Sequence, residues 1–456
     1  MMTGSNPRTM SDIQQLVANG RMSAHQITAI LVCVGLNMLD GFDVLVMSFT
    51  ASGVSSTWTL TGSQVGVLLS AGLVGMALGS LFLAPRADRF GRRAVVMTSV
   101  FIVSVGMLLS AIAQNYWQLA ALRAVTGIGI GGILASATVL VNEYSSKTWR
   151  NTASYLYTSG YSIGGTVGGA IAAILIARSG WRSAFAFGGI VSFAMLPISF
   201  WRLPESLDFL VTRQPAGALR KLNQLLTRMH RPTVEALPPI EEQHGIPARA
   251  TLKQLFSPEL LRSTCLIWTA FFFMMGGYYF VFGWTPKLLA SNGLTAQQGI
   301  TSGVLLSLGG IFGTVIFAFI ARVLEPRVLI TFCLLVSSAL MGVFAMTTHN
   351  VSVGLLAGVA LGGMSTSAMA GFYALTPALY GPHLRTTGMG WGIGIGRLGA
   401  ILAPLATGVL VDHGWHSLEL YWLFAGTFLI ASLALAAMAP SRRASLLPQK
   451  LRQGET

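Results

Sequence analysis

Long apolar runs recur along this chain, and they limit what it can fold into. A run of about 20 apolar residues is long enough to cross the hydrocarbon core of a bilayer as one helix. Charged residues make up only 10% of the 456 residues, whereas a soluble domain carries about 25%. The mean hydropathy of +0.65 points the same way. We therefore expect a polytopic helical membrane protein and exclude both a soluble globular domain and a disordered chain.

These runs predict twelve membrane-spanning helices in two sets of six. Two related helical halves with a site between them are the usual build of secondary transporters. We therefore expect an all-α membrane protein with two pseudo-symmetric six-helix bundles. The predicted spans are Ile27–Phe49, Gln64–Ala84, Ala94–Ala113, Trp117–Val141, Thr152–Ala177 and Trp181–Trp201, then Cys265–Leu289, Gly299–Ala321, Val328–Thr347, Val351–Tyr380, Thr387–Val411 and Leu420–Met438.

One long polar, proline-rich interval separates the two sets of spans. A faint internal echo supports a duplication, because Arg150 and Arg385 each open a glycine-rich span at the same distance before Gly164 and Gly399. The predicted parts are an N-terminal tail (1–26), a first bundle (27–202), a linker (203–261) with a surface helix near Ala216–Met229, a second bundle (262–440) and a C-terminal tail (441–456).

The net charge of +14 lies almost wholly on one side of the predicted membrane. If the N-terminus is cytoplasmic, 24 of the 29 lysines and arginines fall on the cytoplasmic side and 3 on the other. This positive-inside bias predicts that both termini lie in the cytoplasm of a cell with a bacterial-type inner membrane. The bias also accounts for the basic pI, so we expect membrane lipid as a partner and no nucleic acid.

Three cysteines, Cys33, Cys265 and Cys333, sit singly within apolar runs. Because they form no spaced pair, they predict neither a disulfide framework nor a zinc site, and we expect no metal.

Two aspartates lie in the first predicted span, at Asp40 and Asp43. Residues three apart share one helix face, and a carboxylate inside a membrane span is a functional candidate by default. Two adjacent carboxylates in an apolar site favour the protonated form of one of them. We expect this pair to carry a coupling proton. The alternative is a structural role, in which they cap a helix break at Gly41 or pair with an internal arginine.

Arg123 and Arg397 are the two cations inside predicted spans. An isolated arginine is costly there, so each should face an interior cavity or an anion. A guanidinium can bind a carboxylate through two parallel hydrogen bonds. Arg123 could bind the substrate carboxylate in this way, or it could pair with Asp40 or Asp43 as a structural or proton-coupling switch. We assign Arg123 to proton coupling, and Arg397 to the substrate or to charge balance near it.

The loop after the second span reads Ala87-Asp88-Arg89-Phe90-Gly91-Arg92-Arg93. Its simplest interpretation is a positive-inside anchor. Its acidic residue, glycine and basic pair resemble the signature of the major facilitator superfamily, which forms a conformation-dependent lock. The resemblance implies gating roles for Asp88, Arg89, Gly91, Arg92 and Arg93. Glu143, at the inner end of its span, is a further gating candidate.

Further motifs narrow this resemblance to the aromatic acid:proton symporter family of that superfamily, over nearly the whole chain. They are Asp40-Gly41-Phe42-Asp43, the glycine-rich run Arg123–Gly132, Asn142-Glu143-Tyr144, Leu203-Pro204-Glu205-Ser206 and the run Arg385–Gly399. The resemblance implies that Asp40, Asp43, Asp88 and Arg123 are needed for transport.

Aromatic residues crowd the seventh predicted span. Some of them must face lipid or the interfacial belt, but rings that carry a polar group also suit an aromatic acid. The candidate substrate-binding residues beside Arg397 are Tyr157, Tyr161, Tyr278, Tyr279, Trp284, Tyr373 and Trp391.

Together these features predict a proton-coupled importer of small aromatic carboxylates, such as hydroxybenzoate or benzoate, that works by alternating access. We expect no cofactor beyond the coupling protons, because no phosphate-binding loop of the Gly-x-x-x-x-Gly-Lys type is present. We expect the chain to act as a monomer and not as an enzyme. The alternatives are a carrier of another organic acid or of a sugar, and a transporter-derived membrane sensor.

Overall fold

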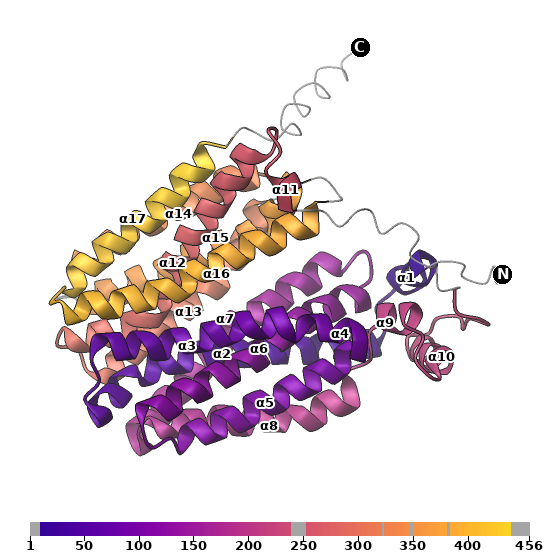
Figure 1. Cartoon of the computed structure of the whole chain (residues 1–456), viewed down its shortest axis with the longest axis horizontal. Helices are drawn as coiled ribbons and strands as arrows, with labels where there is room; N and C mark the ends of the chain where they lie inside the picture. The colour runs from indigo at the N-terminus through magenta and orange to yellow at the C-terminus, as the bar shows by residue number, and fades with distance from the viewer. Residues whose placement is uncertain (1–9, 239–251, 322, 347–350, 381–383, 439–456) are drawn as a thin grey trace, which may run out of the picture. The chain divides into compact units, whose positions relative to one another are not determined.

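The structure is a computed structural model, and it describes residues 10–238, 252–321, 323–346, 351–380 and 384–438. Helices account for nearly all of this part of the chain (Figure 1). Twelve of the helices in the described residues are long and apolar enough to cross a membrane. This confirms the predicted count of spans and the all-α membrane fold.

The described chain divides into two compact units. Unit 1 comprises residues 1–59 and 71–244, and unit 2 comprises residues 60–70 and 245–456. The boundary falls within one helix, because the first part of α3 groups with unit 2 and the remainder with unit 1.

Among the described residues, unit 1 contains the first six spans, apart from the first part of α3, and four short helices. Its closest helix pairs are α2 with α7, α5 with α6, and α5 with α8. Its helices are α1 (Met10–Ala18), α2 (Ala24–Trp58), α3 (Gly62–Phe82, from residue 71), α4 (Ala84–Phe90), α5 (Arg92–Ala111), α6 (Tyr116–Tyr144), α7 (Arg150–Ser179), α8 (Arg182–Arg202), α9 (Leu207–Thr212) and α10 (Ala218–Arg228).

Unit 2 contains the other six spans and the first part of α3. Its closest pairs are α13 with α15, α12 with α16, and α14 with α17. Its helices are α11 (Leu252–Leu255), α12 (Leu261–Ser291), α13 (Ala296–Ile320), α14 (Pro326–Met346), α15 (Val351–Leu379), α16 (Arg385–Asp412) and α17 (Ser417–Ala436).

Side chains cap several of the helix starts. Ser23 and Gln26 form a reciprocal capping box at the start of α2, and Thr295 and Gln298 do the same for α13. Inside the spans, buried hydroxyls such as that of Thr50 donate to a carbonyl one turn back, at Val46. Such bonds give buried hydroxyls a partner within their own helix, which a bilayer without water demands.

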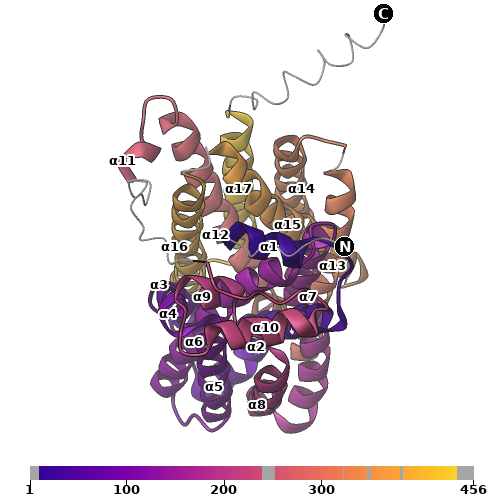
Figure 2. The same cartoon turned by 90° about the vertical axis from the view of Figure 1, so that its right-hand side faces the viewer.

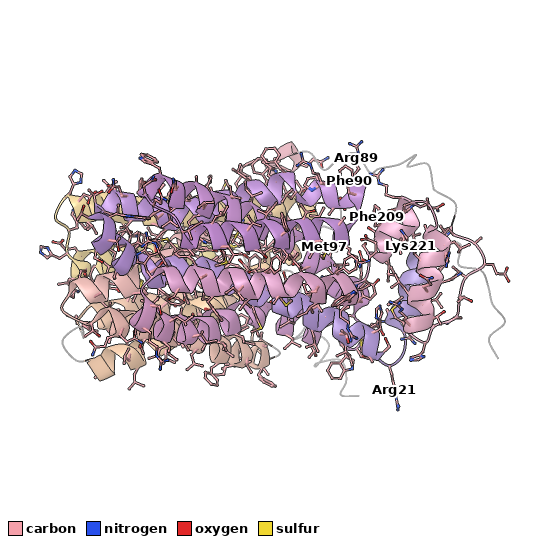
Figure 3. The ribbon with its side chains drawn as sticks, turned by 90° about the horizontal axis from the view of Figure 1, so that it is seen from below. Arg21, Arg89, Phe90, Met97, Phe209 and Lys221 are labelled. Atoms are coloured by element: carbon pink, nitrogen blue, oxygen red, sulfur yellow. The ribbon has the colours of Figure 1, made fainter. Side chains whose placement is uncertain are left out.

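Three short helices gather at the end of unit 1 that carries α4. Figure 2 shows α1, α9 and α10 lying across the ends of the spans, and α9 contacts both α1 and α10. In Figure 3, Arg89 and Phe90 of α4 lie at the same end of unit 1 as Phe209 of α9 and Lys221 of α10. The surface helix predicted in the linker is α10. It begins two residues after the predicted start and ends one residue before the predicted end.

The helix α1 lies within the segment predicted as a polar tail. It forms because Ile13 and Val17, one turn apart, bury their side chains against the rest of unit 1. The backbone N–H of Lys147 donates to the carbonyl of Ala18, and the guanidinium of Arg231 reaches the carbonyl of Arg21. Two buried residues on one face are too few to produce a visible helical period in a nine-residue segment.

Candidate functional site

A buried ion pair joins α2 to α6 in unit 1. Nη1 of Arg123 donates to Oδ1 of Asp43 at 2.8 Å, and Nη2 donates to Oδ2 at 2.9 Å. Nη2 also donates to the backbone carbonyl of Asp43 at 2.8 Å. Only 2% of Arg123 and 1% of Asp43 are exposed. Parallel hydrogen bonds of this kind fix the geometry of both side chains and make the pair strong.

The arginine keeps donor capacity beyond this pair. Among the described residues, Nε of Arg123 has no hydrogen-bond partner, although it is buried. The guanidinium carbon lies 5.9 Å from the centre of the Phe185 ring, within the range of a cation–π contact. Arg123 is therefore held on one side by a carboxylate and approached on another by an aromatic ring.

Asp40 lies one helical turn before Asp43 on α2, and only 3% of it is exposed. It is close enough to Tyr157 of α7 for an electrostatic interaction. The hydroxyl of Tyr157 lies 3.4 Å from Oγ1 of Thr138. The structure thus brings together Asp40, Asp43, Arg123 and Tyr157, which come from three helices of unit 1.

A close helix contact places the carboxylates beside α7. A Cβ on Gly41 would overlap the Tyr161 carbonyl, and a Cβ on Gly164 would overlap the Met38 carbonyl. The two helices therefore meet backbone to backbone on either side of Asp40, as small residues allow in membrane proteins. Near the same point, Nδ2 of Asn37 donates to the Tyr157 carbonyl at 2.6 Å. Tyr161, another predicted ligand residue, is consequently half-buried next to the aspartates.

In unit 2, Arg397 lies on α16 and is half-buried. No carboxylate among the residues that the structure describes forms an ion pair with it. Gly390 and Gly394 precede it by seven and three residues, so they share its helix face. A Cβ at either glycine would meet no atom within 4 Å. The face of α16 that leads to Arg397 is therefore open.

Four of the five predicted aromatic residues of unit 2 contact other rings. Trp391 is 44% exposed and stacks on Trp268 with 6.0 Å between ring centres. Tyr373 contacts Phe271 edge-on. Tyr278 packs against both Tyr279 and Phe282.

Trp284 differs from the other predicted aromatic residues in its surroundings. It is fully buried, and its Nε1 donates to the carbonyl of Pro404 at 3.2 Å. This hydrogen bond makes Trp284 part of the packing between α12 and α16.

The predicted gating residues gather around Arg92 at the start of α5. Its guanidinium lies 3.4 Å from Asp88, 3.6 Å from Glu143 and 3.9 Å from Asp208. Glu143 also accepts hydrogen bonds from the hydroxyl of Ser206 and the backbone N–H of Leu207, both at 2.9 Å. The linker segment before α9 is thus bound to the ends of α5 and α6.

Glu205 and Asp208 were not predicted as site residues. Oε1 of Glu205 accepts from the backbone N–H of Arg93 at 3.1 Å, and a Cβ on Gly91 would crowd its Oε2. Gly91 has a φ of +97°, which a residue with a Cβ rarely adopts. Sequence reasoning noted Glu205 only within a motif. The available signal was the presence of two acidic residues, at positions 205 and 208, which could pair with the arginines of the loop at 86–93.

Arg89 and Arg93 make different contacts. Arg89 is exposed, and its guanidinium lies over the ring of the adjacent Phe90. Arg93 donates to the carbonyl of Phe200 on α8 and lies over the ring of the same residue. Arg93 therefore ties the loop to α8, whereas Arg89 extends away from the cluster.

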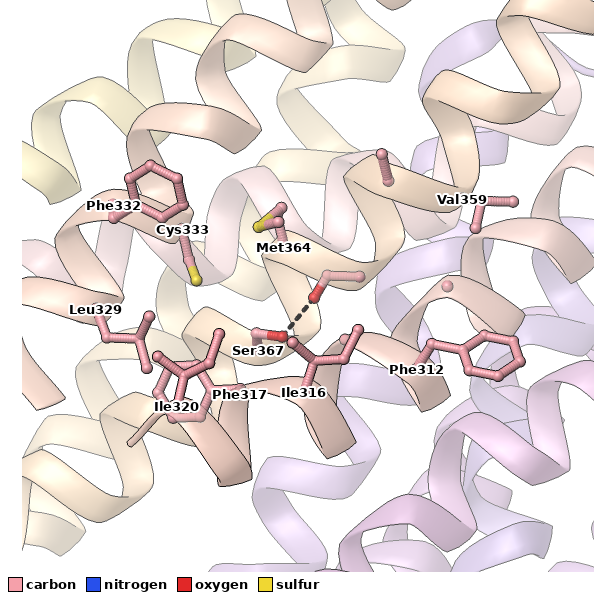
Figure 4. Close-up of a pocket in the computed structure, with 14 residues that line it drawn as sticks. Phe312, Ile316, Phe317, Ile320, Leu329, Phe332, Cys333, Val359, Met364 and Ser367 are labelled. Atoms are coloured by element: carbon pink, nitrogen blue, oxygen red, sulfur yellow. Dashed lines mark hydrogen bonds between the residues drawn. The ribbon is translucent and has the colours of Figure 1, made fainter. Parts of the chain in front are cut away.

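An apolar cavity of about 240 Å³ lies among α13, α14 and α15 of unit 2 (Figure 4). Its walls include Phe312, Ile316, Phe317 and Phe332, and the hydroxyl of Ser367 within it donates to the Gly363 carbonyl. It contains none of the predicted site residues. No charged side chain lines it, so it offers nothing that would bind a carboxylate.

Comparison with known proteins identifies relatives of the whole chain. The sequence matches the Major Facilitator Superfamily over residues 31–344. It is 33% identical to a gallate transporter of Pseudomonas putida, with 94% of this chain and 96% of that protein aligned. It is 31% identical to the 4-hydroxybenzoate transporter PcaK of Pseudomonas aeruginosa, with 94% and 95% aligned.

Solved structures show the same fold at lower sequence identity. The xylose transporter XylE of E. coli, in a partially occluded inward open conformation, superposes with a TM-score of 0.72. The match covers 92% of this chain and 99% of XylE at 16% identity. Together with the family match and the twelve spans, these relatives show that the chain is a multi-pass inner-membrane protein and belongs to the Major Facilitator Superfamily.

Proposed function

We propose that this protein is a proton-coupled importer of small aromatic carboxylates that works by alternating access. One observation carries the proposal. Two carboxylates and one guanidinium are buried together within membrane spans, at Asp40, Asp43 and Arg123. The substrate class is supported by the relatives that align over nearly the whole chain, which are named for gallate and 4-hydroxybenzoate.

The proton step follows from the charges inside unit 1. Arg123 binds Asp43 through two hydrogen bonds, so the guanidinium compensates the charge of that carboxylate. A second carboxylate one turn away leaves this group of three with a net charge of −1. A proton on Asp40 removes that charge, which is costly inside a membrane span. Asp40 is thus the proton carrier, and Asp43 with Arg123 is the fixed part of the coupling site.

The substrate step requires a cation for the carboxylate and room for the ring. Arg397 supplies the cation, and the open face at Gly390 and Gly394 leaves space beside it. Trp391 and Tyr373 provide aromatic surface on α16 and α15. Edge-to-face contacts with such rings favour an aromatic acid over an aliphatic one of the same charge.

The gating step uses the cluster around Arg92. Breaking its contacts with Asp88, Glu143 and Asp208 costs electrostatic energy in one conformation only, so the cluster biases the balance between conformations. The positive-inside bias of the sequence supports a cytoplasmic position for this cluster and for both termini. The protein acts as a monomer surrounded by lipid, and protons serve in place of any cofactor.

Uptake into reconstituted vesicles tests the proposal. Labelled 4-hydroxybenzoate, gallate and benzoate are presented with an acidic exterior, and xylose and an aliphatic dicarboxylate serve as competitors. The proposal expects accumulation of at least one aromatic acid that collapses when an ionophore removes the pH gradient. Accumulation of xylose alone would instead identify a sugar carrier. Saturable binding of an aromatic acid without any uptake would identify a sensor.

A further inference from the structure

The first turn of α3 contacts the C-terminal end of α16 through a carboxylate. Both parts of this contact belong to unit 2, because residues 60–70 of α3 group with it. Oδ1 of Asp412, the last residue of α16, accepts from the backbone N–H of Gly62 at 2.5 Å. Oδ2 accepts from the backbone N–H of Ser63 at 2.8 Å and from its hydroxyl at 2.5 Å. A single carboxylate therefore binds the first turn of a helix about 350 positions away in sequence.

These hydrogen bonds complete the cap of α3. Oγ1 of Thr61 accepts from the backbone N–H of Gln64, and the Thr61 carbonyl accepts from that of Val65. Asp412 binds the two remaining donors of the first turn. A carboxylate at a helix N-terminus also interacts favourably with the helix dipole. Lys287 of α12 is close enough to Asp412 for an electrostatic interaction.

Below this cap, the two helices run antiparallel along a smooth seam. A Cβ on Gly62 or on Gly408 would overlap the backbone of the other helix, and a Cβ on Gly66 would crowd the Pro404 carbonyl. One turn further along α3, the hydroxyl of Ser70 donates to the Ile401 carbonyl at 2.8 Å. Glycines and a serine of α3 and a glycine of α16 make these close contacts. The seam can therefore close tightly and separate without repacking a core.

We propose that Asp412 is a gating residue, and that its hydrogen bonds to the first turn of α3 hold this seam closed in one state of the transport cycle. The proposal rests on the proposed function for its transport arm. Alternating access moves the two units against each other, and α3 passes from unit 2 into unit 1 at residue 71, so this motion acts on the contact between its first part and α16. The seam is a gate distinct from the cluster around Arg92, which lies in unit 1.

Thiol labelling tests whether Asp412 holds the seam closed, and this measurement needs no substrate. Ser70 is 2% exposed and lies in the seam, so Ser70→Cys reports its opening in a background where the exposed Cys265 is changed to Ser. We expect Asp412→Asn to raise the rate of N-ethylmaleimide labelling at residue 70 about tenfold, since it removes charge-assisted hydrogen bonds. The matched control is Glu419→Gln, which alters an acidic capping side chain of α17 that does not contact α3.

The buried thiols distinguish opening of the seam from unfolding. Cys33 and Cys333 stay unreactive if only the seam opens, whereas a general loss of structure exposes them as well. A labelling rate at residue 70 that is equal in Asp412→Asn and Glu419→Gln overturns the proposal. Equal acceleration at all three thiols overturns it too, because Asp412 then has only a structural role.

A reversible cross-link tests whether the seam must open during transport. The side chains of Ser63 and Asp412 meet, so the double variant Ser63→Cys/Asp412→Cys can be joined by mild oxidation. We expect oxidation to stop exchange of a labelled aromatic acid, and reduction to restore it. The single variant Ser63→Cys should not respond to the oxidant. Undiminished exchange in the oxidised pair overturns the gating role.

Failure of the proposed function gives a different result. If the parent protein takes up no aromatic acid, the substrate class is wrong. The labelling rates at residue 70 then still decide whether Asp412 holds the seam.

Discussion

Arg123 and Asp43 are joined by two hydrogen bonds of 2.8 and 2.9 Å and are buried almost completely within unit 1. Removing one partner of such a pair leaves an uncompensated charge inside the protein. The pair therefore has to be probed by paired substitutions, because a single substitution measures the stranded charge as well as the lost contact.

Asp43→Asn and Arg123→Gln are each expected to destabilise the folded protein by about 3–5 kcal/mol, because each strands one buried charge. The double variant should lose less than either single variant. Thermal unfolding in detergent, followed by tryptophan fluorescence, measures the three differences. If the losses of the two single variants simply add in the double variant, the ion pair does not contribute to folding.

Asp40→Asn is expected to abolish uptake driven by a pH gradient while counterflow persists. The amide cannot release a proton, but it fills the same space and resembles the protonated acid. Asp40→Glu, which keeps the titratable group, is the control and should retain some gradient-driven uptake. Full accumulation by Asp40→Asn would move the proton-carrying role to another residue.

Coupling through one carboxylate predicts electroneutral symport of one proton with one monovalent anion. One pH unit corresponds to about 1.4 kcal/mol, or a tenfold concentration ratio. Accumulation should therefore rise about tenfold for each unit of imposed pH gradient. An imposed potassium diffusion potential should not change it. A marked response to that potential would show that a second charge moves with the substrate.

Arg397→Gln is expected to raise the KM for the aromatic acid by about 10–100-fold, because a hydrogen bond to a charged group contributes roughly 1.5–3 kcal/mol. Arg397→Lys should have a KM between that of the parent and that of Arg397→Gln, since lysine keeps the charge without the planar pair of donors. Initial uptake rates over a range of concentrations separate KM from the maximal rate. An unchanged KM in Arg397→Gln would exclude this residue from substrate binding.

A bulky residue at position 394 should also weaken substrate binding, because it fills the space beside Arg397. A Cβ there meets no protein atom within 4 Å, so Gly394→Leu is expected to leave folding intact while filling the face that leads to Arg397. We expect weaker binding of larger ring substrates than of benzoate. Competition assays with acids of increasing size measure the difference, and an unaltered size preference would contradict a substrate position on this face.

Arg92→Gln should loosen the linker from unit 1, because Arg92 contacts Asp88, Glu143 and Asp208. Tryptic cleavage after Arg213 or Arg220 is expected to become several-fold faster. Arg89→Gln is the matched control, since Arg89 is exposed and its guanidinium lies over the ring of the adjacent Phe90. Equal cleavage rates in the two variants would show that the cluster does not hold the linker.

The spans could be predicted from the sequence because their length is set by bilayer thickness, which hydropathy reports directly. The tenth predicted span, Val351–Tyr380, agrees with α15 to within one residue. The first spanning helix, α2, extends to Trp58, nine residues beyond the predicted end at Phe49. Polar serines and threonines after Phe49 lower the hydropathy there, but their hydroxyls donate to carbonyls within the helix and so allow it to continue.

The site was predictable only as a set of candidates. Asp40, Asp43 and Arg123 stood out because charge is costly inside a span, yet the sequence left open which aspartate pairs with the arginine. That choice depends on the rotation of α2 against α6. Asp412 could not be found, because an aspartate at a span end looks like an ordinary surface residue until its partner helix is known.

Backbone contact between α2 and α7 at Gly41 and Gly164 holds the two aspartates of α2 and the tyrosines of α7 in fixed positions relative to each other. The two aspartates and the tyrosines of α7 must then move together whenever the transporter changes conformation. Efforts to alter which acid is carried should accordingly begin on α16, where a new side chain can be introduced without disturbing the proton-coupling residues of unit 1.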